Sequence, residues 1–505
     1  MNQLSLFDAE IQENPSNALF LIKKYFPLDE IIPPAWIFKF YKRFGRKRDY
    51  SLSSFLWALI IQKVLTIPTT ELLISILNIS SELRDFCEFY KIPDKSKFSR
   101  FRTSFHNEIE EFFHSMVDLT EPICRAIDAE ASKTLIIDTT GIEVYVTENN
   151  PKYFSSIQKR VESYLKSRNE QPEPAKVIAY AAKQMPKTAL SNSDASYQYI
   201  NGHFAYALKG AIICNKLGLV RHLKFCDSFH NTSDDLIEEK YLYDSKVFAP
   251  TLREFYSRHS SFRYKYILGD AGFDTIDNNN IAFNECGMIP LIALNPRHTV
   301  SNHPKPGVNN SCPNDPTLPL IVDRIIRENG RKPRIKLMCP KTKRTSKGYV
   351  CSCENPCSTS KLGYSHNVYL DANLRENPII PRDSSQWNDI AGNRHIVEQV
   401  ISRLKLPLSL ANCYTRDSRT VKFDFFMAGA VQLIVAYVTF QAGLVNKFRC
   451  IKSFAFWILI VHIHTKGFFV MPFFSLSNRL LTFQCSILLD LQSLLLLQHC
   501  SLLLN

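Results

Sequence analysis

The spacing of apolar residues changes near residue 134, and this change constrains the fold more than any other feature of the chain. From residue 16 to about residue 125, apolar residues recur at the spacing of helices that bury one face. Thr69 or Thr70, and further on Asp94, stand where such helices begin, and these residue types cap helix N-termini. The N-terminal region is therefore predicted to be all-helical.

After residue 134 the chain consists of short apolar runs, typical of buried strands, separated by turns and helical stretches. The predicted elements are a strand (134–138), a hairpin (204–225) around Asn215 to Gly218, a helix opening at Ser233, a strand (264–270), a short helix that stops at Gly287 and a strand (288–294). This order predicts an α/β fold, a mixed sheet flanked by helices.

Four regions follow from this pattern. They are a helical region (1–125), an α/β domain in two segments (130–298 and 385–447), a Pro- and Asn-rich, basic insertion that contains cysteines (299–384) and an apolar tail (448–505). Residues 150–200 form a second, polar interruption of the α/β domain. The tail differs so sharply in composition that we interpret it as out-of-frame or read-through sequence.

The formal charge of +13 and the pI of about 9.0 favour a polyanionic partner. Residues 42–50 hold Arg46, Lys47 and Arg48 around a glycine, and residues 95–105 form a second basic, aromatic stretch. Such clusters suit DNA phosphates. Each is equally compatible with a solvated helix edge.

No signal peptide is visible at the N-terminus, so the fourteen cysteines are expected to be mostly reduced. The uncharged segment Phe425 to Val445 is long enough for a membrane span, but it contains two glutamines and fits a buried central helix better. We therefore expect a cytoplasmic, nucleoid-associated protein without a membrane partner.

Two aspartates stand where a buried run meets a polar turn containing glycine, namely Asp138 and Asp270. Sites in α/β sheets are often built at such strand ends, although either residue alone could be a turn or cap aspartate. The segment 393–405 predicts a helix on which Glu398 shares a face with Arg394 and Lys405. An ordinary surface ion pair is the alternative for that face.

Taken together, the three acids suit phosphodiester chemistry. Two divalent ions about 3.5–4 Å apart can activate a hydroxyl nucleophile, stabilise the leaving oxygen and shield developing charge. Mg²⁺ prefers oxygen ligands, with Mn²⁺ as an alternative, so Asp138, Asp270 and Glu398 could hold both ions. Arg394 and Lys405 would then contact DNA phosphates, and Lys209 could reach DNA as well.

These segments resemble those of bacterial insertion-sequence DDE transposases, which have an RNase H-like catalytic domain. IIDTTG and LGDAGFD resemble the motifs of the first and second aspartates. Arg394, Glu398 and Lys405 keep the spacing of the Tyr-Arg-Glu-Lys signature, whereas Ala391 stands at the tyrosine position. IPDKSKFSRFR is similar to a segment before the catalytic domain, and the resemblance covers residues 16 to about 445.

The resemblance implies DNA transposition. The enzyme would bind the terminal inverted repeats of its element, nick DNA with water and join the freed 3′-hydroxyl to target DNA. A homodimer on double-stranded DNA is plausible because two ends must be joined. Two alternatives stay open: a metal-dependent nuclease without strand transfer, and an inactive or domesticated DNA-binding derivative.

Four cysteines of the insertion lie close in sequence: Cys339, Cys351, Cys353 and Cys357. Four thiolates can enclose a structural Zn²⁺, but the spacing here lacks the usual pair of two-residue knuckles. Reduced free thiols are the alternative.

Overall fold

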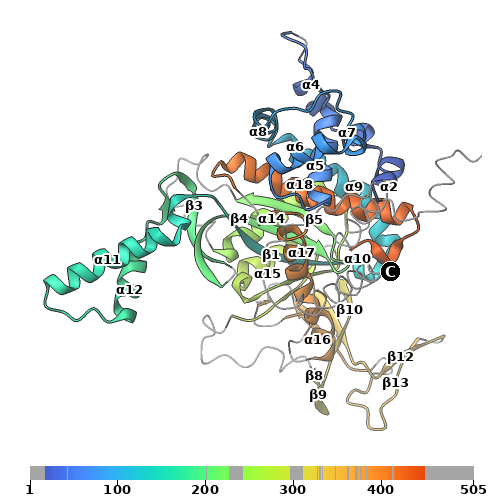
Figure 1. Ribbon diagram of the computed structural model, residues 1–505. Helices are drawn as coiled ribbons and strands as arrows, with labels where there is room; N and C mark the ends of the chain where they lie inside the picture. The colour runs from blue at the N-terminus through green and yellow to red at the C-terminus, as the bar shows by residue number, and fades with distance from the viewer. Residues whose placement is uncertain are drawn as a thin grey trace, which may run out of the picture. The chain divides into compact units, whose positions relative to one another are not determined.

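The computed structural model describes residues 18–449, except for 43, 201, 227–242, 296–310, 412–413 and short breaks between 327 and 383. The predicted tail, apart from its first two residues, and the start of the helix expected at Ser233 lie outside the described residues. Within the described part the chain is mixed α/β, as predicted (Figure 1).

The N-terminal region is all-helical, which confirms the prediction. Its helices are α2 (Ala18–Tyr25), α3 (Leu28–Ile31), α4 (Pro34–Phe40), α5 (Leu52–Val64), α6 (Thr70–Ile79), α7 (Ser81–Phe86), α8 (Lys95–Ser104), α9 (Glu108–Ile127) and α10 (Ala129–Ser132). Thr69 caps α6 by accepting the Leu72 N–H, and Asp94 caps α8 by accepting the Lys97 N–H. Both capping predictions are therefore confirmed.

The central sheet joins antiparallel and parallel strands. Its members are β1 (Thr134–Glu143), β2 (Thr188–Ala189), β3 (Asn192–Ile200), β4 (His203–Asn215), β5 (Val220–Cys226), β6 (Tyr266–Gly269) and β7 (Ile289–Ile292). The order is β2-β3-β4-β1-β6-β7, and β5 pairs with β4 beyond the residues that pair with β3. β1 pairs antiparallel with β4 but parallel with β6, and β6 pairs parallel with β7.

The helices of this part follow the predicted order. They are α14 (Asp244–Arg258), α15 (Ile276–Asn280) with a wider turn (Ile281–Glu285), α16 (Ser385–Ala391), α17 (His395–Lys405) and α18 (Ser418–Gln441), with short 3₁₀ turns at Thr147–Asn149, Ala271–Phe273, Gly392–Arg394 and Val445–Lys447. Gly218 closes the β4–β5 hairpin and Gly287 ends the α15 segment, both with positive φ, as expected.

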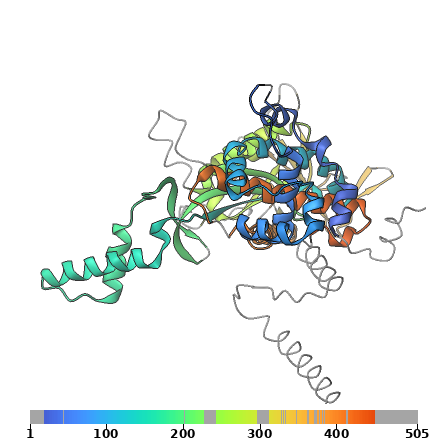
Figure 2. The ribbon, with the colours of Figure 1, turned by 45° about the horizontal axis from the view of Figure 1, so that its top comes forward.

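The polar segment 150–200 is folded, which its composition did not reveal. It forms α11 (Pro151–Ser167) and α12 (Pro174–Gln184), which lie side by side (Figure 2), followed by β2 and β3. Ile157, Val161 and Leu165 recur on one face of α11 and pack with Val177 of α12 in a small separate core. Helical spacing was therefore present but sparse among charged residues.

The insertion is built from short strands. These are β8 (Ser311–Cys312), β9 (Asp315–Pro319), β10 (Ile321–Ile326), β11 (Arg334–Met338), β12 (Thr342–Thr345), β13 (Gly348–Cys351) and β14 (Ser365–Tyr369). β10, β11 and β14 form one three-stranded sheet, and the other four form two hairpins. Leu320, Ile335 and Leu337 belong to the same continuous core as the central sheet.

Helix α18 connects the N-terminal helices with the sheet. By length and composition it could span a membrane, but its apolar window is 83% buried against α2, α5, α8, α9 and β5. Glycine permits this close approach, because a Cβ at Gly210 would lie 2.8 Å from the Phe425 ring and one at Gly429 2.5 Å from Leu223. The structure thus places α18 as a core helix.

Candidate active site

Parallel pairing of β1 with β6 brings the two predicted aspartates to the same end of neighbouring strands. Thr134 pairs with Tyr266 and Ile136 with Leu268; Asp138 stands two residues beyond this pairing in β1, and Asp270 directly follows β6. Neighbouring strands lie about 4.8 Å apart, and the charge of Asp270 acts on Asp138. The expected end of β1 at Asp138 is wrong, because β1 continues beside β4 to Glu143. What ends near Asp138 is the pairing with β6.

Burial makes both carboxylates reluctant to ionise. It raises the pKa of Asp138 to about 6; the Thr139 N–H, which donates to Asp138 at 2.8 Å, opposes this rise, and the charge of Asp270 adds to it. Burial also raises the pKa of Asp270, which caps its turn by accepting the Gly272 N–H at 2.9 Å. The two neighbouring carboxylates of Asp138 and Asp270 would be easier to ionise with a cation bound beside them.

A further acid, Asp244, adjoins this pair and was not anticipated. Its Oδ1 accepts a 2.6 Å hydrogen bond from Thr139 Oγ1 and lies 2.6 Å from Lys209 Nζ. A Cβ at Gly272 would lie 3.0 Å from Asp270 Oδ1 and 3.3 Å from Asp244 Oδ2, so glycine keeps the space between these carboxylates open. The sequence did not point to this acid, because Asp244 was expected inside a helix that starts at Ser233. In the structure α14 begins at Asp244, eleven residues later. Lys209, expected to reach DNA, is ion-paired here.

Arg394 links the aspartates to Glu398. Its guanidinium donates to Glu398 Oε1 at 2.8 Å, one helical turn along α17. The positive charge of Arg394 partly opposes the rise in the pKa of Asp138 and of Asp270, so this guanidinium lies within electrostatic range of both. Helix α17 packs against β1 and β4 through its apolar face. On the same helix burial lowers the pKa of Lys405, and the nearby charge of Glu143 opposes that shift.

The donor set suits a hard divalent ion. Asp138, Asp270, Asp244 and Glu398 offer only carboxylate oxygens, which Mg²⁺ and Mn²⁺ prefer. In the described part of the chain, however, no three Asp, Glu, His or Cys side chains converge closely enough to hold a metal. Asp138 and Asp270 offer carboxylates within electrostatic range of each other, while the 54% exposed Glu398 side chain is engaged by Arg394.

The insertion gathers its cysteines and adds one that the sequence did not suggest. Cys312 Sγ lies 3.7 Å from Cys357 Sγ, and Asn314 Nδ2 donates to the Asn355 carbonyl at 3.4 Å. Cys339 is buried directly after β11. Burial is the main cause that raises the pKa of its thiol, and the charges of Cys312 and Cys351 raise it further. The predicted set of four omitted Cys312, because the strands β9, β10 and β11 lie between it and Cys339 in the sequence.

The three predicted cations of the N-terminal loop have different surroundings. Arg46 lies 3.6 Å from Asp49 and is largely exposed, and Lys47 is exposed. Arg48 Nε donates to the Phe40 carbonyl at 2.6 Å, so this side chain shapes the loop.

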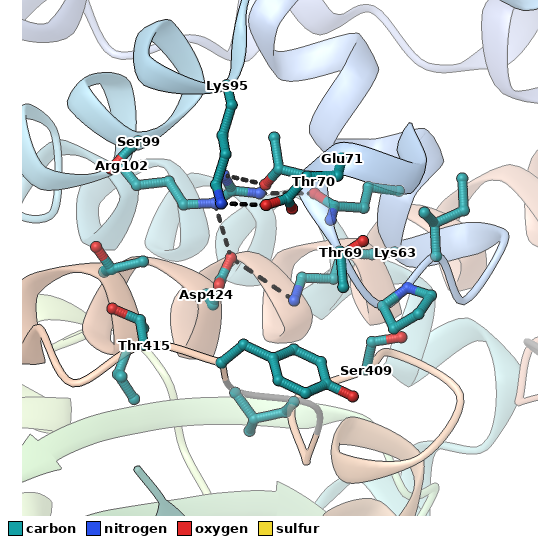
Figure 3. A pocket seen from close by; sticks show the side chains of 17 residues that line it. Lys63, Thr69, Thr70, Glu71, Lys95, Ser99, Arg102, Ser409, Thr415 and Asp424 are labelled. Carbon is teal, nitrogen blue, oxygen red and sulfur yellow. Dashed lines mark hydrogen bonds and ion pairs between the residues drawn. The ribbon is translucent and has the colours of Figure 1, made fainter. Parts of the chain in front are cut away.

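A cavity of about 400 Å³ lies away from the strand aspartates, between α5, α6, α8, α18 and the segment after α17 (Figure 3). At its centre Asp424 Oδ1 lies 3.3 Å from Arg102 Nε and 3.6 Å from Lys63 Nζ. Arg102 also donates to Gln62 at 2.6 Å and to Thr70 at 3.1 Å. These contacts tie N-terminal helices to α18.

One comparison with known proteins bears on these observations. Residues 7–104 match the family model described as "Transposase domain (DUF772)". The match supports a transposase family, and with it an enzyme that acts on DNA, but it covers about one fifth of the chain and includes none of Asp138, Asp244, Asp270 and Glu398. No curated protein matches this chain.

Proposed function

We propose that the protein is a DDE transposase with an RNase H-like catalytic core that cuts and joins DNA. Asp138 in β1 and Asp270, directly after the neighbouring strand β6, carry this proposal, because burial and like charge favour a cation between them. The transposase match in the helical region supports it independently. Glu398 is the third ligand in this proposal, released from Arg394 when metal and DNA are present.

Bound at this site, two Mg²⁺ or Mn²⁺ ions would activate the attacking oxygen and stabilise the leaving oxygen of the phosphodiester. Asp138 and Asp270 would bind and orient them from rigid strands. Lys209 neutralises Asp244 and so limits the negative charge at the site. Arg394, once free of Glu398, and Lys405 would hold the phosphate backbone beside the cleavage point.

The other expectations stay part of this proposal. Double-stranded DNA with terminal inverted repeats is the substrate, a homodimer joins two ends, and the protein acts in the cytoplasm at the nucleoid. Arg46, Lys47 and Arg48 belong to the DNA-binding region.

Asp270→Asn is expected to lower Mg²⁺-dependent DNA strand cleavage by at least about a thousandfold, because a metal ligand is lost. Glu398→Gln should have a comparable effect. The matched control is Asp277→Asn, an exposed acid of α15, which should cleave at the wild-type rate. The assay uses purified protein with the DNA that flanks its reading frame and scores both nicked and joined products.

Each other result excludes a specific claim. Wild-type cleavage by Asp270→Asn would show that the catalytic assignment is wrong. Cleavage without joined products would favour a nuclease that lacks strand transfer. DNA binding without any metal-dependent cleavage would favour an inactive derivative. The replacement of the signature tyrosine by Ala391 is the sequence feature that supports this alternative.

A structural zinc ion is also proposed for the insertion, held by Cys312 and Cys357 with two of Cys339, Cys351 and Cys353. These last thiols would have to move toward the first pair, because no three described side chains of ligand type converge closely enough to hold a metal as they stand. Tetrahedral zinc with bonds of about 2.3 Å places its sulfurs about 3.8 Å apart, close to the 3.7 Å between Cys312 and Cys357. A disulfide would need about 2.0 Å. Such an ion would stiffen the insertion.

Elemental analysis is expected to find about one zinc per chain, and Cys312→Ser should remove most of it. Cys286→Ser is the control, because this half-buried cysteine lies outside the insertion. A protein with these five thiols reduced and no bound zinc would exclude the site.

A further inference from the structure

A basic pocket of about 320 Å³ lies between the loop after α4 and helix α8. The loop contributes Arg46 and Lys47, and α8 contributes Lys97 and Arg100. Asp49 is the one acid among the described residues that line it. The fold therefore unites two basic stretches that are separate clusters in the sequence.

The loop is anchored on the side that faces the core. The Arg48 guanidinium stacks 4.2 Å from the Phe40 ring centre and 5.8 Å from that of Phe105, while its Nε donates to the Phe40 carbonyl. At its other end the Leu52 N–H donates to the Tyr41 hydroxyl at 3.0 Å. Arg48 thus fixes the loop that carries Arg46 and Lys47, and all three residues are exposed.

The four remaining cations are poorly neutralised. Arg46 has a long 3.6 Å contact with Asp49, and its side chain is 88% exposed. Among the described residues, no carboxylate lies within ion-pair distance of Lys47, Lys97 or Arg100, although the charge of Lys97 acts on the capping Asp94, and the Arg100 side chain donates hydrogen bonds to Ser96 of its own helix. Helix α8 contains no acid. Clustered cations of this kind attract a polyanion.

Chemistry and spacing favour DNA over a small anion. Four cations from two segments exceed what one phosphate neutralises, whereas duplex DNA carries one charge per about 1.7 Å of its axis. The phenylalanines that line the pocket, such as Phe40, Phe101 and Phe105, are buried and offer no open ring face for a base, and the exposed Phe44 of the same loop does not line it. Contacts made by the cations of the pocket would therefore be with the backbone and independent of base sequence.

We propose that Arg46, Lys47, Lys97 and Arg100 form one binding site for the phosphate backbone of double-stranded DNA. The inference rests on the proposed function, because it specifies which surface holds the DNA on which the strand aspartates act. It adds Lys97 and Arg100, on α8, to the binding surface.

The test is fluorescence anisotropy with labelled duplexes of two unrelated sequences, without divalent ions, over about 50–200 mM salt. Lys97→Gln/Arg100→Gln should weaken binding to both duplexes at least about tenfold. The slope of log K against log salt should shrink by about 1.8, or about 0.9 per lost phosphate contact. Arg46→Gln/Lys47→Gln should act alike. Lys91→Gln, an exposed lysine outside the pocket, should match wild type.

The outcomes separate this inference from the proposed function. If wild type binds DNA and both double variants keep the salt dependence of wild type, the pocket is not the binding site. The proposed metal-dependent cleavage would still stand in that case. If wild type binds no duplex, both proposals fail. Loss of binding to anionic vesicles but not to DNA would assign the pocket to membranes and overturn the inference. If a variant does not fold, chemical labelling of Lys47 and Lys97 in the wild-type protein replaces it as the test. Labelling that is equal with and without bound duplex would refute the contact of these lysines with DNA.

Discussion

Asp424→Ala is expected to lower the free energy of unfolding by about 3 kcal/mol, the low end of the cost of removing one partner from a buried ion pair, because the Asp424 side chain itself is 23% exposed. Asp424 is the carboxylate that Arg102 and Lys63 share, and both of these side chains are only 6% exposed. Since whole proteins have about 5–15 kcal/mol of stability, the variant should lie near the limit of folding. Urea denaturation followed by circular dichroism measures the change.

An exposed ion pair provides the control. Arg253 and Glu285 lie 2.7 Å apart with side chains 56% and 46% exposed, so Glu285→Ala should cost less than about 1 kcal/mol. Equal losses in the two variants would mean that the Asp424 network contributes little, and that apolar packing alone holds the N-terminal helices to α18.

Asp138→Asn is expected to abolish cleavage and yet stabilise the metal-free protein by about 2 kcal/mol at neutral pH. A pKa raised from 3.8 to about 6 corresponds to roughly 3 kcal/mol, which partial exposure of Asp138 reduces through solvent screening. Because the folded pKa is the higher one, this penalty is absent below about pH 4, grows as pH rises through about 6 and is complete above it. Thermal unfolding at several pH values should show the two proteins converging in acid.

Adding Mg²⁺ distinguishes a ligand from a merely strained carboxylate. The ion should raise the melting temperature of wild type by binding the folded state and should have little effect on Asp138→Asn. The control Asp277→Asn should respond to Mg²⁺ as wild type does. A wild-type protein that Mg²⁺ does not stabilise, or an Asp138→Asn variant that is less stable at neutral pH, would contradict this interpretation of the site.

Local features of the fold were predictable where the physical cause is itself local. A capping hydroxyl or carboxylate satisfies N–H groups three residues away, so Thr69 and Asp94 could be recognised from sequence. The turn at Gly218 depends on four residues, and the ion pair of Arg394 with Glu398 on one helical turn. The α11 helix was missed because its apolar face is narrow and most of its residues are polar.

The amino-acid sequence by itself determined the all-helical N-terminal region, the order of the β1, β4, β5, β6 and β7 strands and the presence of acids where apolar runs meet polar turns, because hydrophobic periodicity and capping act within a few residues. Only the tertiary structure decided that β1 pairs in parallel with β6, so that Asp138 and Asp270 come within electrostatic range of each other, and that Asp244, Cys312 and the two basic stretches join their groups. Strand register and the meeting of distant segments depend on packing across the whole core, which no local pattern specifies.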